Sequence, residues 1–138
     1  MYNYQIITHR PGVEYSAPHF FILSKGNNSG RPMKNPCPNC FVCKTYSDEE
    51  ATYLYWVSFF IFKNKSIFRL LHGSVIPFVR IIDYKKEFRK FLEKAISRKT
   101  SFMKSVEVLE TLQKSKINMS KHLSKIDNAM MSVSMLKY

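Results

Sequence analysis

The feature that most constrains the fold is a dense aromatic stretch, residues 53–86, which contains the only tryptophan of the chain. Just before it, Ser47 is followed three residues later by Glu50, and two further acids lie between them. This is the spacing of a capping box, and acids favour the start of a helix. The residues that follow are apolar on nearly all sides, which is typical of a helix buried in a core. We therefore expect a buried helix over 50–62, which is too short to cross a membrane because a span needs about 20 apolar residues.

The second half of this stretch predicts short elements. Asn64 is suited to cap a second short helix over 67–71, and Gly73 breaks that helix. Residues 75–82 are rich in β-branched side chains, with a proline near their start, which favours a strand. Asp83 then begins another helix. The sequence thus predicts an α+β fold: a small, curled, mostly antiparallel sheet with two short buried helices, followed by a long C-terminal helix or helical hairpin.

Upstream, residues 2–8 and 19–23 predict two strands, and residues 25–38 predict a long loop rich in glycine and proline. Every charge in this loop is basic, and loops on a rigid sheet often hold binding residues. The alternative is a solvated turn cluster, since Asn-Asn-Ser-Gly is ordinary turn chemistry. The side chains of the types that contact phosphates and base edges are Lys25, Asn27, Asn28, Ser29, Arg31 and Lys34.

Three further candidates for DNA contact lie around the Gly-Ser turn. His72 precedes the turn and Ser74 belongs to it. His72 has an alternative role at a helix end. Arg80 is the only charge in the predicted strand 75–82, so it is either a ligand contact or part of a solvated edge.

The three cysteines lie close together, as Cys37, Cys40 and Cys43. The first pair has the spacing of a zinc knuckle, but the second pair that such sites place about 15 to 20 residues later is absent. The cysteines are therefore weak metal candidates, and a redox pair is a further alternative. We expect structural free thiols, because buried cysteines are commonly plain core residues. We predict no bound metal and no cofactor.

The net charge of the chain favours an anionic partner. The charge is +12, and residues 84–138 contain 13 lysines and arginines against five acids. An excess of this size suits nucleic acid, an acidic protein or an anionic membrane surface, and solubility alone is the plain alternative. A basic tail of this kind would hold phosphates without choosing a sequence.

The C-terminal part of the chain predicts helix. Neither glycine nor proline occurs after Pro77. We expect a domain over residues 1–83 and a helical tail over 84–138, where residues 84–97 have helical spacing. Eight positions then follow a seven-residue pattern typical of a coiled coil, and Lys116 is the only one that is not apolar. The alternatives are an intermolecular coiled coil, a coiled coil against the helix at 84–97, and an amphipathic helix folded back on its own domain. The apolar positions are Leu109, Leu112, Met119, Leu123, Ile126, Met130 and Val133.

The order of these motifs resembles the target-recognition domain of type I restriction-modification specificity subunits. The resemblance covers about residues 20–90 and rests on an aromatic helix, a short Phe-Arg helix, a Gly-Ser-x-x-Pro turn, a charged helix start and a basic glycine-containing loop. These motifs match residues 53–56, 67–69, 73–77, 83–86 and 23–32. The segments PHFFILSKGNNSG and PCPNCF also resemble a small uncharacterised bacterial family.

The resemblance implies a domain that recognises duplex DNA, followed by a long helix that packs against a second such helix. A single-domain version would need to form a homodimer, which we expect through residues 102–135. It also implies service to a methyltransferase or nuclease partner, or regulation of restriction.

From the residues alone, no catalytic constellation emerges, since the histidines are scattered and no nucleotide-binding or zinc-protease motif occurs. We therefore predict a non-catalytic DNA-binding module rather than an enzyme. The alternative is a protein-interaction or assembly module whose basic charge is incidental. The first residues lack the basic start and apolar core of a signal peptide, and no transmembrane run appears, so we expect a cytoplasmic protein without a membrane partner.

Overall fold

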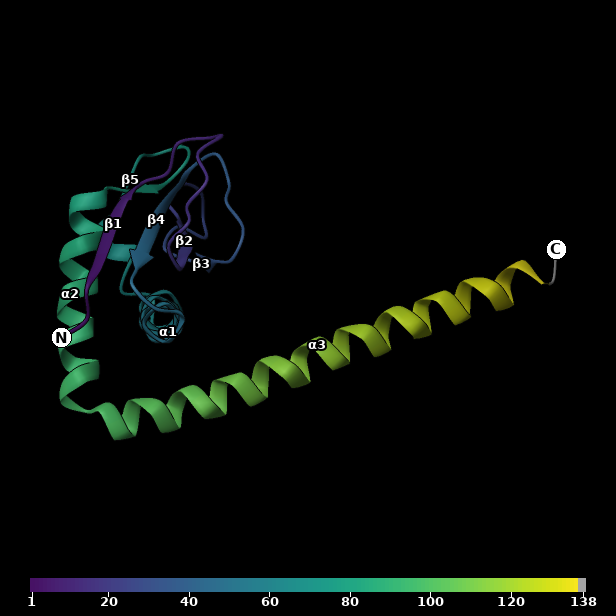
Figure 1. Ribbon diagram of the computed structural model, residues 1–138. Coiled ribbons are helices and arrows are strands. Elements are labelled where there is room, and N and C mark those ends of the chain that lie inside the picture. The colour runs from purple at the N-terminus through teal and green to yellow at the C-terminus, as the bar shows by residue number, and fades with distance from the viewer. Residues whose placement is uncertain (137–138) are drawn as a thin grey trace. The chain divides into compact units, whose positions relative to one another are not determined.

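A computed structural model describes residues 1–136 and confirms the predicted α+β class (Figure 1). The chain divides into two compact units, of which unit 1 is Met1–Ser97 and unit 2 begins at Arg98. The division lies after residue 97 and not at the expected position 83/84, because the helix that follows residue 80 buries its apolar face within unit 1.

Unit 1 is built on a four-stranded antiparallel sheet, β1 (Tyr4–Thr8), β2 (His19–Leu23), β3 (Pro32–Met33) and β4 (Cys40–Thr45), in the order β1-β4-β2-β3. The strands β1 and β2 fall where the sequence predicts them. The longest strand, β4, pairs with both β1 and β2, so it forms the middle of the sheet. Its first four residues are all buried, in keeping with this central place.

Two helices, α1 (Asp48–Lys63) and α2 (Ile81–Ser97), cover one face of this sheet (Figure 1). Alternation along the strands sends every second side chain towards them. Pairs of aromatic rings join the sheet to the helices. These ring pairs are Phe20 with Tyr55, Phe41 with Tyr84, and Tyr4 with Phe88.

The other face of the sheet has a small core of its own, built from Phe21, Cys40 and Val42. Partly buried side chains from the strands and from the loops before β2 and β4 pack against it, Tyr15 and Cys37 among them. Both faces of the sheet are therefore buried, and the loops that cover the second face take part in the core.

The capping box before α1 is confirmed. The Ser47 hydroxyl accepts a hydrogen bond from the Glu50 backbone N–H at 3.2 Å, and the Glu50 carboxylate accepts one from the Tyr46 N–H at 3.2 Å. The first bond satisfies a backbone donor that the first turn of a helix leaves unpaired, and the second holds the residue before the N-cap. The helix is sunk into the core as predicted. Its buried residues are Tyr53, Leu54, Trp56, Val57, Ser58 and Ile61.

The segment between α1 and α2 departs from prediction. The second short helix is a single 3-10 turn, η1 (Phe68–Leu70), because Asn64 ends α1 and its side chain accepts the Ser66 N–H in a tight turn. A two-stranded ribbon follows, formed by β5 (Leu71–His72) and β6 (Phe78–Val79).

The strand predicted over 75–82 is therefore only two residues long, and α2 begins at Ile81 and not at Asp83. The spacing of buried side chains explains this outcome. Tyr84, Phe88 and Leu92 recur every fourth residue and are all buried, which is a helical period. Burial of this stripe outweighs the local preference of β-branched residues for strand.

Unit 2 consists of one helix, α3 (Lys99–Met135). It begins two residues after the end of α2 and continues for 37 residues without interruption. Within the described part of the chain, no helix combines the length and the apolar character that crossing a bilayer requires.

Candidate nucleic-acid interface

Backbone hydrogen bonds join the glycine-rich loop after β2 to the ribbon strand β6. The Gly26 N–H donates to the Pro77 carbonyl at 2.7 Å, and the Val79 N–H donates to the Ser24 carbonyl at 3.0 Å. Between these two bonds, Lys25 forms an antiparallel bridge with Phe78. The structure therefore brings together two segments that lie about 50 residues apart in the sequence, and these are the two segments in which candidate DNA contacts were predicted.

The loop itself is a tight, internally bonded turn. The Ser29 hydroxyl donates to the Gly26 carbonyl at 2.6 Å, and the Gly30 N–H donates to the Leu23 carbonyl at 2.6 Å. Gly30 has a φ of +92° and lies against the buried side chain of Ile67. These contacts hold the loop in one conformation, which suits a surface that must match a ligand.

Seven of the nine predicted contact residues are exposed, one is half-buried and one is buried. Ser29 is only 4% exposed, and its hydroxyl is used inside the turn. It therefore belongs to the scaffold of the loop and is removed from the set of DNA contacts. His72 is half-buried. The exposed candidates are Lys25, Asn27, Asn28, Arg31, Lys34, Ser74 and Arg80.

Two acids in the first half of α2 pair with basic side chains from the preceding segment. The Asp83 carboxylate accepts a hydrogen bond from Arg80 Nε at 2.7 Å and lies 3.3 Å from His72 Nε2. The Arg80 hydrogen bond is the main reason why the pKa of Asp83 is lowered, and His72 contributes in the same direction. Glu87 pairs with Arg69 at 3.3 Å. Arg80 is thus a helix-start residue held by an acid, and not the strand residue that the sequence predicted.

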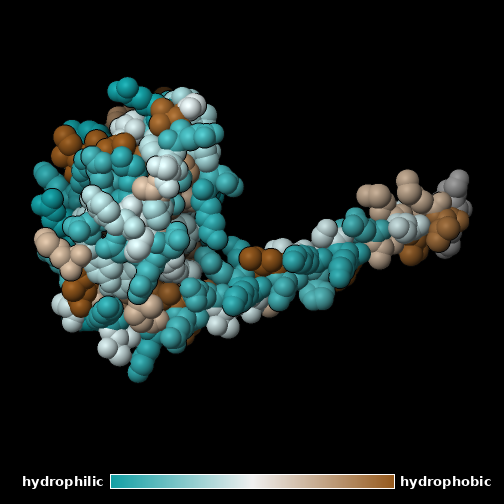
Figure 2. Space-filling view, viewed as in Figure 1, coloured by the Kyte–Doolittle hydropathy of each residue, from teal (hydrophilic) through white to brown (hydrophobic). Residues whose placement is uncertain are grey.

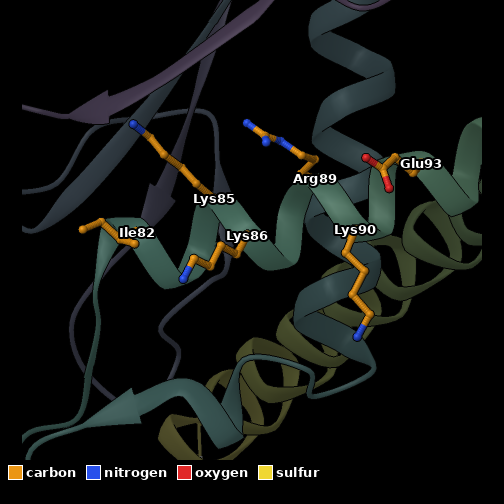
Figure 3. Close-up of a pocket in the computed structure, with 6 residues that line it drawn as sticks. All are labelled: Ile82, Lys85, Lys86, Arg89, Lys90 and Glu93. Carbon is orange, nitrogen blue, oxygen red and sulfur yellow. The ribbon is translucent and has the colours of Figure 1, made fainter.

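The exposed side of α2 supplies a group of cations that are not among the contact residues predicted from the sequence. Lys85 and Arg89 extend to one side of the helix, whereas Lys86 and Lys90 extend to the other (Figure 3). The side chains enclose a shallow hollow of about 360 Å³. The excess of basic residues after position 83 was the signal that could have found them. The lining residues are Ile82, Lys85, Lys86, Arg89, Lys90 and Glu93.

Apolar side chains lie at the tip of the ribbon, next to the loop. Val75 is 89% exposed and Ile76 is 54% exposed, while Phe78 is 40% exposed beside Lys25. Gly73 starts the tip with a φ of +90°, and an added Cβ would lie 2.7 Å from the Ile76 carbonyl oxygen. The sequence predicted a strand over 75–82, and its β-branched pattern did not indicate that Val75 and Ile76 would form an exposed tip.

The cysteines are arranged as core residues. The Cys40 thiol donates to the Cys37 carbonyl at 3.1 Å on one face of the sheet, whereas Cys43 lies on the opposite face beneath the helices. Strand alternation therefore separates Cys43 from Cys37 and Cys40, which pack together on the other face of the sheet. Among residues 1–136, no group of three or more His, Cys, Asp or Glu side chains is placed to hold a metal ion.

Residues 6–135 match the sequence model of a family of unknown function, DUF6943. The match spans β1 through the last turn of α3, and so includes the loop, the ribbon and both units. Neither the curated proteins nor the solved structures contain a significant match to the chain.

Proposed function

The chain belongs to the family of unknown function DUF6943, and we propose that it is a non-catalytic module that binds duplex DNA. The observation that supports this most is the backbone pairing of the basic loop with the ribbon. Because Gly26 bonds to Pro77, the loop and the ribbon form one continuous, rigid edge of unit 1. Lysine, arginine and asparagine side chains are exposed along it.

The chemistry of the loop suits both kinds of contact that DNA recognition needs. Lys25, Arg31 and Lys34 provide cations for phosphate oxygens. The neighbouring Asn27 and Asn28 provide amides, which pair with adenine edges in the major groove. The exposed apolar tip at Val75 and Ile76 adds side chains of the kind that contact thymine methyl groups or unstacked base steps.

The cations of α2 contribute affinity without sequence choice. The side chains at 85 and 89, and those at 86 and 90, are each one turn apart along the helix, so each pair forms a short row about 6 Å long. Rows of this kind neutralise successive phosphates and release counterions. The nearby acids Asp83 and Glu87 are held in ion pairs with Arg80 and Arg69.

In this proposal the module works for a partner that performs the chemistry. The order of motifs along residues 20–90 resembles the recognition domains of restriction-modification specificity subunits, which deliver a methyltransferase or nuclease to a DNA site. Service to such an enzyme, or regulation of it, is therefore the role that we propose.

The loop is tested by a charge-matched comparison. The variant Lys25→Ala/Arg31→Ala/Lys34→Ala removes three exposed cations from the loop, and the control Lys114→Ala/Lys121→Ala/Lys125→Ala removes three from α3. We expect the loop variant to weaken binding to duplex DNA by about tenfold or more, and by clearly more than the control. Circular dichroism checks that both variants fold. An equal or larger loss in the control would remove the loop from the proposed site.

A second candidate function is a protein-interaction or assembly module, which the exposed apolar seam of α3 favours. From Glu107 to Leu136 no described residue of α3 is buried. Binding through such a seam would respond little to salt, whereas binding to phosphates weakens steeply as salt rises. The two candidates are thus separated by one salt titration.

A further inference from the structure

The helix α3 exposes an apolar stripe that a lone helix would not be expected to leave in water. Leu112 is 58% exposed, Leu123 62% and Ile126 55%. Figure 2 shows apolar side chains gathered towards the C-terminal end of this helix, where Met130 and Val133 are each 66% exposed. Only Leu109 and Gln113 are half-buried among the described residues after Val106.

The spacing of this stripe identifies the kind of partner that it suits. Its positions recur at alternating intervals of three and four residues from 109 to 133, which gives a narrow seam with a period of 3.5. Such a seam is typical of helix pairs in coiled coils, whereas a helix that lies on a globular surface has a broader stripe. Helices outside a packed context gain little stability from propensity alone, so a second helix along the seam is expected.

We propose that the second helix is α3 of another copy of this chain, and that the two copies run antiparallel. The charges of the seam distinguish the two orientations. Lys116 is the one charged residue at a seam position, and Asp127 is the one acid after Glu110. In a parallel pair, the two copies of Lys116 would meet in the same layer, which places like charges together at a buried position.

In the antiparallel pair, the register that overlaps the whole seam sets 109 opposite 133, 112 opposite 130, 116 opposite 126, and 119 opposite 123. Lys116 of each copy then lies opposite Ile126 of the other, next to Asp127, which flanks the seam. The lysine stem packs on the isoleucine and the ammonium group reaches the carboxylate, so two symmetric ion pairs form. The only charged seam residue thereby meets an opposite charge.

This inference does not rest on DNA binding, because the residues that it uses lie in unit 2. Within one chain, Lys116 and Asp127 are 11 residues apart, or about 16 Å along a helix. They are too distant to pair with each other. Any energetic coupling between them in solution therefore reports a contact between two copies.

The test uses sedimentation equilibrium of the full chain at low salt, over about 1 to 100 µM, with charge reversals at the two positions. We expect the wild-type chain to dimerise. Lys116→Glu and Asp127→Lys should each raise the dimer Kd by about tenfold, because each replaces two attractions with two repulsions. The double variant Lys116→Glu/Asp127→Lys restores opposite charges and should return to within about threefold of the wild-type Kd.

The matched control is Lys114→Glu, which reverses a charge on the outer side of the helix and should leave the dimer Kd nearly unchanged. A wild-type chain that stays monomeric at tens of micromolar would overturn the proposal, as would a trimer or larger assembly. A dimer in which the double variant is weaker than both single variants would overturn the antiparallel register.

Discussion

The hydroxyl groups of Ser58 and Tyr84 lie 2.7 Å apart in the interior of unit 1 and join α1 to α2 by a hydrogen bond. Both side chains are fully buried. Burial raises the pKa of the Tyr84 phenol, so it remains neutral and serves as a hydrogen-bonding group. A buried hydroxyl group without a hydrogen-bond partner costs free energy. The pair therefore favours the packing of α1 against α2 in which both hydroxyls are bonded.

We therefore expect non-additive effects when the pair is removed. Tyr84→Phe or Ser58→Ala alone should lower the free energy of unfolding by about 1 to 3 kcal/mol, because each leaves a buried hydroxyl without its partner. The double variant should lose less than the sum of the two. Urea denaturation of the four proteins measures the coupling, and strictly additive losses would show that the hydrogen bond contributes nothing.

Gly30 connects the candidate DNA-binding loop to the core. An added Cβ would lie 2.8 Å from the Ile67 side chain, which is 1% exposed, and the backbone φ of +92° is unfavourable for any other residue. We expect Gly30→Ala to lower the free energy of unfolding by about 2 to 4 kcal/mol, from backbone strain and crowding together. Thermal or urea unfolding measures this loss.

Gly12 provides the control for that substitution. Its φ is +83°, but no atom lies within 4 Å of an added Cβ. Gly12→Ala should therefore lower the free energy of unfolding only through backbone strain, by about 1 kcal/mol. If both variants lost the same stability, the contact between Gly30 and Ile67 would have no energetic weight.

The cysteines should differ in reactivity towards thiol reagents. Burial is the main cause that raises the pKa of Cys40 to about 11 and that of Cys43 to about 12, so the reactive thiolate is scarce at neutral pH. Cys37 is half-buried. We expect one thiol per chain to react with Ellman's reagent at pH 7.5, and the other two to react only after unfolding. Rapid reaction of all three in the native protein would contradict the packing of β4.

Local signals predicted the parts of the fold that depend on neighbouring residues. The capping box at Ser47 and Glu50 is a local device, and α1 begins where it predicts. The strand His19–Leu23 is bounded as expected because its short apolar run and the turn residues beside it are both local signals. By contrast, the partner of Ser58 lies 26 residues away, and nothing in the local pattern indicates that pairing.

The candidate site was only partly predictable for the same reason. Asn27, Ser29 and Arg31 look alike as polar loop residues, and only the three-dimensional fold distinguishes the buried Ser29 from its exposed neighbours. The hydrogen bond from Gly26 to Pro77 is also long-range. The sequence therefore predicted the loop and the Gly-Ser turn region as separate candidate segments, without indicating that they adjoin. The cations of α2 belong to the basic excess after position 83, but their place in unit 1 depends on the packing of α2 against the sheet, which the local pattern does not indicate.

Whether the module binds DNA through phosphate contacts is decided by the affinity of the full chain for duplex DNA as a function of salt. If four to six phosphates are contacted, as an order-of-magnitude estimate, the affinity should fall by about 100-fold or more between about 50 and 200 mM salt. The loop and α2 cations account for contacts in this range. Absence of binding at about 50 mM salt, or an affinity that does not change with salt, would contradict the account.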